Sequence, residues 1–204
     1  MSKVCMMRIF TQSLNTFGLW SHTMSEAPVD WDTLTFSMTE TDSMYITKTK
    51  IDEPWTPGEM RPYGNISISP AAGVMNYGQG LFEGMKAYRT SAGRVVLFRP
   101  EENARRMQRG ADRLKMPPVP ESIFIDAVEQ CVQQNERWIP PMGKGALYVR
   151  PLLNGSGPVL GVAPAPEYTF MVYVTPVGPY FKGGMTCIKS VSYTHLTLPT
   201  KLSV

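Results

Sequence analysis

The hydrophobic and polar positions of the chain predict short strands on either side of a helical region. Apolar or alternating runs that are bounded by turn residues are typical of strands. Such runs occur at Trp31 to Phe36, Met44 to Ile51, Gly64 to Ser69, Lys86 to Tyr88, Arg94 to Phe98, Ala146 to Leu153 and Tyr168 to Thr175. The fourth and fifth runs flank a short segment with Gly93 as a turn residue, so they predict a hairpin.

In the helical region, apolar positions recur every three or four residues. A first helix is predicted from Pro100 until Met116, where two prolines follow. A second helix is predicted between Pro120 and Pro140, with an apolar stripe of Phe124, Ala127, Val128, Cys131, Val132 and Trp138. Strands followed by two helices and further strands predict an α+β fold, with the helices packed on a largely antiparallel sheet.

The composition narrows the classes of function. The chain has 204 residues, of which 43% are hydrophobic and 18% charged, and its formal net charge is +3. These values are ordinary for a globular domain, and no apolar run approaches the roughly 20 residues of a membrane helix. The basic residues form no long arm of the kind that binds nucleic acid. We therefore expect neither a membrane nor a nucleic acid as a partner.

Cysteine and histidine are too few and too scattered for metal or disulfide chemistry. The cysteines (Cys5, Cys131 and Cys187) are odd in number and far apart, and the histidines (His22 and His195) lie near the chain ends. We therefore expect no metal site, no disulfide framework and no Ser/His nucleophile. Cys131 is predicted to be a core thiol.

The first 25 residues suggest two destinations for the protein. They contain Lys3 and Arg8, several hydroxyl residues and no acid before Glu26. This pattern is typical of an organellar transit peptide, and it is equally compatible with a disordered leader. The first case predicts a plastid or a mitochondrion, and the second predicts the cytoplasm.

A glycine-rich run from Asn76 to Gly84 invites comparison with a dinucleotide-binding loop. Its glycines have the spacing GxGxxxG, one residue too long, and the run leads into a strand rather than a helix. Glycines that let the backbone pack closely explain the run better. Tyr77 and Phe82 are then free to line a pocket.

Two other segments hold candidate polar groups. The alternation of strand residues puts Tyr148 and Arg150 on one face of their strand. There the two side chains could bind a carboxylate together. An exposed strand face with a solvated arginine explains the spacing better. The first helix carries four arginines, Arg105, Arg106, Arg109 and Arg113. Arg106 lies nearest to the apolar stripe by a small margin, so helix geometry does not choose between an anion site and a solvated basic face.

Two specific runs resemble a known enzyme family. They are Asn-Tyr-Gly-Gln-Gly-Leu-Phe-Glu-Gly-Met-Lys-Ala-Tyr (Asn76 to Tyr88) and Leu-Phe-Arg-Pro-Glu-Glu-Asn-Ala-Arg-Arg-Met (Leu97 to Met107). Both are similar to the branched-chain amino-acid aminotransferases. The likeness continues through Leu147 to Leu153 and Gly155 to Phe170, and it covers roughly Pro28 to Ser190. The amino-acid sequences of these runs are most similar to those of the plant members.

The resemblance implies a fold-type IV enzyme that uses pyridoxal 5'-phosphate, of which this chain supplies the small N-terminal domain. Matched position by position, Arg106 is similar to the arginine that holds the cofactor phosphate. Tyr77, Phe82 and Tyr148 match the aromatic pocket for the substrate side chain. Arg150 matches the arginine that meets the side-chain carboxylate of glutamate.

The resemblance also implies substrates and a partner. The substrates are the branched-chain amino acids Leu, Ile and Val in one half-reaction, and glutamate or 2-oxoglutarate in the other. Leu160 and Val162 match a loop that in the family reaches the active site of the partner subunit, so a homodimer is implied.

Part of the family pattern is missing. Family members carry the lysine that forms a Schiff base with the cofactor in a Lys-x-x-x-Asn-Tyr run, and no lysine of this chain stands in that context, whereas Lys86 matches a strand residue. We therefore expect no catalytic residue in the chain and an inactive piece. Residues 1–27 are predicted to be a leader, 28–176 the small domain, and 177–190 the interdomain linker and the start of the large domain. Residues 191–204 depart from the family pattern and resemble a translated sequencing adapter, so we interpret them as an artefact.

Two alternatives stay open. The chain could be a non-catalytic module that pairs with full-length subunits. It could also derive from another fold-type IV enzyme, either a D-amino-acid aminotransferase or an aminodeoxychorismate lyase. The Gly-Gln-Gly-Leu-Phe-Glu-Gly and Tyr-Val-Arg-Pro runs favour the branched-chain enzymes.

Overall fold

A single antiparallel sheet forms the framework of the protein. The structure, a computed structural model, describes residues 7–9 and 27–179. In this part of the chain eight strands pair in the order β1-β6-β5-β7-β8-β2-β3, and β4 pairs with β7 beside this path. The strands are β1 (Met7–Ile9), β2 (Ser43–Lys50), β3 (Glu59–Pro62), β4 (Gly80–Phe82), β5 (Met85–Arg89), β6 (Val95–Phe98), β7 (Ala146–Gly155) and β8 (Glu167–Val177). Every pairing is antiparallel, as the sequence predicts.

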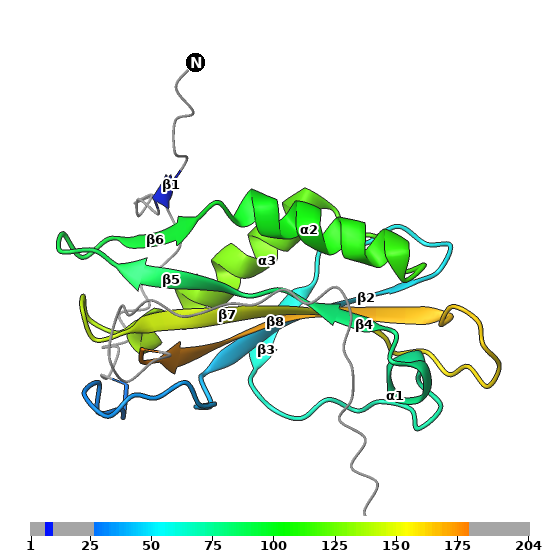
Figure 1. The fold of residues 1–204 in the computed structure, drawn as a ribbon, viewed down its shortest axis with the longest axis horizontal. Helices are drawn as coiled ribbons and strands as arrows, with labels where there is room; N and C mark the ends of the chain where they lie inside the picture. The colour runs from blue at the N-terminus through cyan, green and yellow to red at the C-terminus, as the bar shows by residue number, and fades with distance from the viewer. Residues whose placement is uncertain (1–6, 10–26, 180–204) are drawn as a thin grey trace, which may run out of the picture.

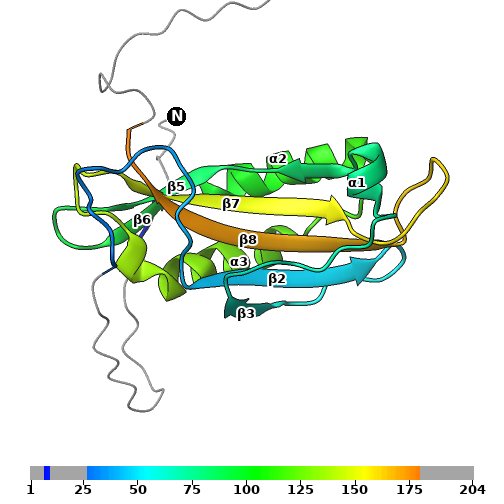
Figure 2. The ribbon, with the colours of Figure 1, turned by 90° about the horizontal axis from the view of Figure 1, so that it is seen from below.

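Two long helices cover one face of this sheet (Figures 1 and 2). The helices of the described part are α1 (Gly73–Tyr77), α2 (Pro100–Arg113) and α3 (Glu121–Gln134), with a 3-10 turn at Glu136–Trp138. Pro100 opens α2, and α3 begins directly after Pro120, which confirms both predicted helices, although α3 ends at Gln134, so that Trp138 of the predicted stripe lies in the 3-10 turn. We call the sheet face away from α2 and α3 the second face.

The core lies between the sheet and the two long helices. On β7, Leu147, Val149 and Leu153 have no exposed surface. Beside them, the Phe170 ring lies 5.9 to 6.4 Å from the rings of three aromatic side chains that come from α3, β2 and the loop after β2, namely Phe124, Tyr45 and Trp55. Such aromatic contacts supply a large share of the apolar surface that a core buries.

Cys131 of α3 belongs to this core. Its side chain is fully buried, and burial raises the pKa of its thiol to about 12. The thiol therefore stays protonated and unreactive at neutral pH, because the thiolate is the nucleophilic form. The prediction of a core thiol is confirmed.

Two predicted strands are wrong. Residues 31–36 form a turn, because the Asp30 carboxylate accepts the N–H of Asp32 at 3.0 Å and the Asp30 carbonyl accepts that of Thr33 at 3.2 Å. Residues 64–69 form an irregular segment that crosses the second face. Ile66 and Ile68 line a cavity there, although Ile66 is exposed and Ile68 only partly buried, so their alternation does not correspond to a paired strand.

Besides β1, three short elements were not predicted from the sequence. The edge strand β3 is polar and ends at Pro62, a residue that an edge position tolerates. The helix α1 and the strand β4 lie within the glycine-rich region, where the sequence predicts only a turn and strand-like residues. All three have five residues or fewer, which is too short for a periodic pattern.

The predicted leader and tail fall mostly outside the described residues. Met7–Ile9, inside the predicted leader, pairs with β6 as an edge strand. The predicted linker is described only for residues 177–179, and the predicted tail not at all. Among the described residues, no helix is long and apolar enough to cross a membrane.

A buried asparagine joins the end of α3 to the start of β2. The Asn135 side-chain oxygen accepts the backbone N–H groups of Asp42 at 3.0 Å and Ser43 at 3.1 Å. Its amide nitrogen donates to the carbonyls of Ser43 at 2.9 Å and Cys131 at 2.7 Å. Asn135 itself has no exposed surface, so water cannot replace these hydrogen bonds.

We predict that Asn135→Ala lowers the free energy of unfolding by about 2 to 4 kcal/mol, because it leaves buried backbone groups without partners. Urea denaturation monitored by circular dichroism measures the change. Gln134→Ala is the matched control, since the neighbouring side chain is exposed, and its effect should stay within about 0.5 kcal/mol. Equal effects of the two substitutions would contradict this role of Asn135.

Candidate functional site

Strand β7 presents a tyrosine and an arginine together on the second face. Tyr148 and Arg150 are both half-buried, whereas their neighbour Val149 faces the core. The Arg150 guanidinium Nη2 donates a hydrogen bond of 3.1 Å to the Tyr148 hydroxyl. The prediction that these two side chains share a face is confirmed.

Aromatic rings surround the Arg150 guanidinium. Its central carbon lies 4.3 Å from the ring centroid of Phe82 and 5.1 Å from that of Tyr148. Phe82 reaches this position because β4 pairs with β7 and puts Phe82 opposite Leu152. A cation over a ring face is attracted to the negative charge of the π system. The rings therefore stabilise the positive charge of Arg150 without a carboxylate.

One more aromatic side chain belongs to this group. The Phe36 ring packs edge-on against Tyr148, with centroids 5.4 Å apart and an angle of 79° between the planes. No sequence pattern pointed to this role, because Phe36 lies in the segment that was predicted to be a strand. Only the turn after Asp30 and the path that follows bring it to the second face.

Arg150 keeps hydrogen-bonding capacity for a ligand. Within the described structure its Nε is buried and has no hydrogen-bond partner. A guanidinium has five N–H donors, and a planar fork of two of them matches a carboxylate. The buried Nε is out of reach of a ligand, but the Nη donors that do not bond Tyr148 can bind a carboxylate, and the aromatic rings can contact an apolar group.

The glycines of the Asn76–Gly84 run allow close backbone packing, as predicted. Gly78 has a φ of +64° and ends α1 in the left-handed conformation, which favours glycine. A Cβ atom on Gly84 would overlap the Tyr148 hydroxyl, so only glycine leaves room for that side chain. These glycines position Phe82 and Tyr148 rather than bind a dinucleotide.

On α2, the structure distinguishes Arg106 from its neighbours. The Arg106 Nε and Nη2 donate to the two carboxylate oxygens of Glu83 at 2.6 and 2.5 Å. These hydrogen bonds raise the pKa of Arg106. Arg105 instead pairs at the surface with Glu102 and Glu121. Because 58% of the Arg106 side chain is exposed, its outer edge is accessible to an anion.

Tyr77, Leu160 and Val162 form a separate group at one end of the sheet, where α1 and the loop between β7 and β8 lie together (Figures 1 and 2). The Tyr77 hydroxyl donates to the Leu160 carbonyl. Tyr77 and Val162 also line a shallow pocket of about 350 Å³. Leu160 and Val162 are 93% and 92% exposed. In the described structure, no hydrogen bond or ring contact joins this group to Arg150 or Phe82.

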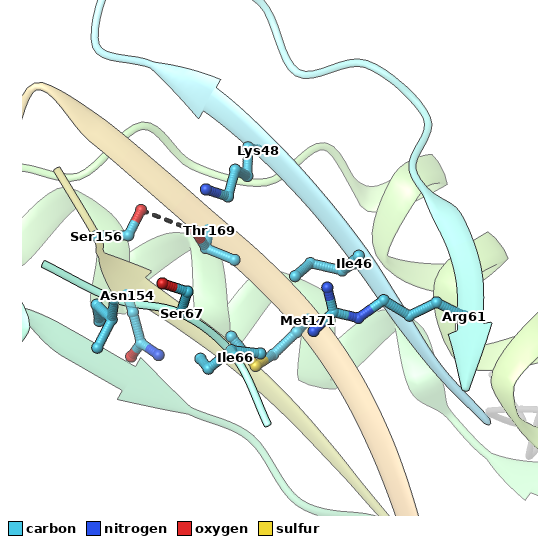
Figure 3. A pocket seen from close by; sticks show the side chains of 10 residues that line it. Ile46, Lys48, Arg61, Ile66, Ser67, Asn154, Ser156, Thr169 and Met171 are labelled. Atoms are coloured by element: carbon cyan, nitrogen blue, oxygen red, sulfur yellow. Dashed lines mark hydrogen bonds between the residues drawn. The ribbon is translucent and has the colours of Figure 1, made fainter. Parts of the chain in front are cut away.

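A second cavity lies on the second face beneath the segment 66–68 (Figure 3). Its volume is about 180 Å³, and β2, β3, β7 and β8, with Ser156 directly after β7, supply the rest of its wall. Ser156 and Thr169 are joined there by a hydrogen bond of 2.8 Å, and Lys48 pairs with Glu167 at 3.1 Å. None of the predicted site residues lines this cavity, so it is distinct from the group around Arg150.

Several curated proteins that are similar to this chain are plant branched-chain amino-acid aminotransferases. A chloroplastic branched-chain amino acid aminotransferase 2 of Humulus lupulus is 57% identical over 177 residues, which are 87% of this chain and 43% of the relative. In Arabidopsis thaliana, the chloroplastic aminotransferase 5 is 55% identical over 83% of this chain and 41% of its own length. The mitochondrial aminotransferase 1 is 56% identical over 79% and 42%. No family model matches the chain.

Solved structures of branched-chain amino acid aminotransferases are also similar to this chain. The branched-chain amino acid aminotransferase of Escherichia coli has a TM-score of 0.55 at 22% identity, over 69% of this chain and 41% of that one. The corresponding enzyme of T.th., solved with pyridoxamine 5'-phosphate, also has a TM-score of 0.55, at 25% identity, over 70% and 42%. The first likeness shows the fold.

The antiparallel sheet with two helices on one face matches the fold of the N-terminal part of the solved branched-chain amino acid aminotransferases, which are fold-type IV enzymes. Within this class, the chain is a homologue of the plant branched-chain amino-acid aminotransferases. It spans about two fifths of the length of the curated relatives it matches, 41% to 43% of the three described above.

Proposed function

We propose that the full-length protein containing this chain is a branched-chain amino-acid aminotransferase. It transfers the amino group of Leu, Ile or Val to 2-oxoglutarate, giving the branched 2-oxo acid and glutamate. The observation that carries this proposal is the Arg150 guanidinium, held between the rings of Phe82 and Tyr148. The names of the relatives support the same reaction class.

The aromatic surroundings of Arg150 suit a pocket that must take two kinds of side chain. When an apolar side chain is bound, the rings of Phe82 and Tyr148 contact it, and the Tyr148 hydroxyl and the ring faces stabilise the arginine. A buried cation without such partners would be costly. When 2-oxoglutarate is bound, its distal carboxylate accepts hydrogen bonds from the same guanidinium.

Arg106 is the candidate residue for binding pyridoxal 5'-phosphate. Its guanidinium is fixed on one edge by Glu83 and exposed over the rest, which fits a phosphate group that approaches from solvent. The bound cofactor supplies the electron sink for the reaction. Arg106 holds it, and the group around Arg150 orients the substrate side chain.

The loop with Leu160 and Val162 is proposed to contact the partner subunit of a homodimer. Two almost fully exposed apolar side chains on an anchored loop suit burial in a second copy of the protein. In this arrangement, the loop of one subunit completes the side-chain pocket of the other.

We also propose that the protein acts in a plastid or a mitochondrion. The names of several relatives place them in chloroplasts or mitochondria. A fluorescent protein fused to the C-terminus of the full-length protein should therefore colocalise with one of these organelles in plant cells. Uniform cytosolic fluorescence would contradict this location.

The first functional prediction concerns Arg150. In the full-length enzyme, Arg150→Met should raise the KM for 2-oxoglutarate about 10- to 100-fold, since a hydrogen-bonded charge pair is lost. The kcat/KM for leucine should change less than about threefold, because an apolar side chain does not need the cation. Arg109→Met, an exposed arginine on α2, is the control and should leave both values unchanged.

Substrate choice decides between the proposal and its alternatives. The full-length protein is assayed with a panel of substrates, namely Leu, Ile, Val, D-amino acids and aminodeoxychorismate. The panel also contains methionine, because an Arabidopsis thaliana methionine aminotransferase is 49% identical over 76% of the chain. Activity on D-amino acids or aminodeoxychorismate without activity on Leu, Ile or Val would overturn the proposal. Equal losses for leucine and 2-oxoglutarate in Arg150→Met would overturn the role of Arg150.

The second functional prediction concerns the dimer. The variant with Leu160→Ser and Val162→Ser should lose most activity toward leucine, while Met142→Ser, another exposed apolar side chain, should not. Mixing the loop variant with Arg150→Met and allowing subunit exchange should restore about a quarter of wild-type activity, when the assay contains 2-oxoglutarate far below the raised KM of Arg150→Met and this variant alone is therefore nearly inactive. Half of randomly paired dimers are mixed, and each mixed dimer has one intact site. If mixing restores no activity, the loop does not serve the partner subunit.

A further inference from the structure

Glu83 is a buried carboxylate at the junction of β4 and β5. Only 5% of the residue is exposed. Its backbone N–H donates to the Pro151 carbonyl at 2.9 Å, so the junction is held against β7. Burial of an ionised carboxylate is costly unless hydrogen-bonded cations or donors surround it. The position of Glu83 therefore depends on the groups that α2 brings to it.

Two side chains of α2 supply these groups. Arg106 donates from Nε and Nη2 to the two carboxylate oxygens of Glu83 at 2.6 and 2.5 Å. Asn103, one helical turn earlier, donates to Oε2 of Glu83 at 2.9 Å and to the Gly84 carbonyl at 3.2 Å. A two-point contact between a guanidinium and a carboxylate fixes the plane of the guanidinium as well as its position.

The contact with Glu83 leaves one side of Arg106 for a ligand. Of the five N–H donors of a guanidinium, the contact uses one on Nε and one on Nη2, so three remain. The Arg106 side chain is 58% exposed, whereas that of Glu83 is 6% exposed. The buried carboxylate thus holds the inner edge of the arginine, and the outer edge faces solvent.

The same junction also sets the position of the side-chain pocket. Phe82, the residue before Glu83, stacks on the Arg150 guanidinium at 4.3 Å. Gly84, the residue after it, lies so close to Tyr148 that a Cβ atom would overlap the hydroxyl. Three consecutive residues therefore connect Arg106 on one side of the sheet with the group around Arg150 on the other.

We propose that Glu83 is a positioning residue, which fixes the guanidinium of Arg106 so that its outer edge receives the phosphate of the cofactor. This inference rests on the proposed function, in which Arg106 binds that phosphate. Glu83 also repels the phosphate, but it lies behind Arg106, and the exposed surroundings of Arg106 screen this repulsion. Losing the fixed orientation weakens phosphate binding more than losing the repulsion strengthens it.

The test compares two ligands that differ only in the phosphate. Full-length apoprotein with Glu83→Gln is titrated with pyridoxal 5'-phosphate and with pyridoxal, and binding is followed by protein fluorescence. The dissociation constant for pyridoxal 5'-phosphate should rise about tenfold, the lower range for a charge-assisted hydrogen bond. That for pyridoxal should change less than twofold. Asp112→Asn, an exposed carboxylate on α2, is the control and should change neither.

A second comparison shows whether Glu83 acts through Arg106. In an Arg106→Met background, Glu83→Gln should cause no further loss of preference for the phosphorylated ligand. Should Glu83→Gln not fold, Asn103→Ala removes the other contact of the carboxylate and keeps the charge pair. It should weaken pyridoxal 5'-phosphate binding in the same selective way, by a smaller factor.

The outcomes separate this inference from the proposed function. Equal weakening of both ligands, or tighter binding of pyridoxal 5'-phosphate, in Glu83→Gln would overturn the positioning role. If the wild-type protein and Arg106→Met bind the two ligands with the same ratio of affinities, the proposed phosphate site itself is wrong. A strong effect of Arg106→Met with no effect of Glu83→Gln or Asn103→Ala would reject only the role of Glu83.

Discussion

The pairing of β7 along both of its edges is the constraint on which the rest of the structure depends. One edge pairs with β4 and β5, and the other pairs with β8 over ten residue pairs. A strand paired in this way cannot shift by one residue without exposing its core face. Leu147 and Val149 therefore stay in the core, and Tyr148 and Arg150 stay on the second face. The helices stabilise the site indirectly, because they bury the opposite side of the same strand.

The charges of Arg150 and Glu83 are stabilised by different kinds of neighbour, and each environment suits a different ligand. Arg150 is stacked against aromatic rings and hydrogen-bonded to the Tyr148 hydroxyl, an environment that suits both an apolar ligand and a carboxylate. Glu83 is surrounded by hydrogen-bond donors and holds a fixed partner in Arg106. An adaptable cation suits a pocket for two kinds of side chain, whereas a fixed cation suits a constant phosphate group.

The sequence predicted those parts of the fold in which local pattern and tertiary packing agree. The helix that begins at Pro100 and the alternation of β7 both bury their apolar positions as expected, so Tyr148 and Arg150 were placed on one face correctly. The contacts of Phe36 and Glu83 were not foreseen, because each depends on a partner from a distant element. The selection of Arg106 among the helix arginines came from family resemblance, and its contact with the buried Glu83 distinguishes it from Arg105, which pairs at the surface.

We propose that one strand junction, Phe82 to Gly84, positions both Arg106 for the cofactor phosphate and the group around Arg150 for the substrate side chain. The most direct measurement is a crystal structure of the full-length protein with pyridoxal 5'-phosphate and 2-oxoglutarate bound. We expect hydrogen bonds from Arg106 to the phosphate and from Arg150 to the distal carboxylate, with Arg106 still bound to Glu83. A phosphate bound away from Arg106, or a distal carboxylate bound away from Arg150, would contradict this proposal.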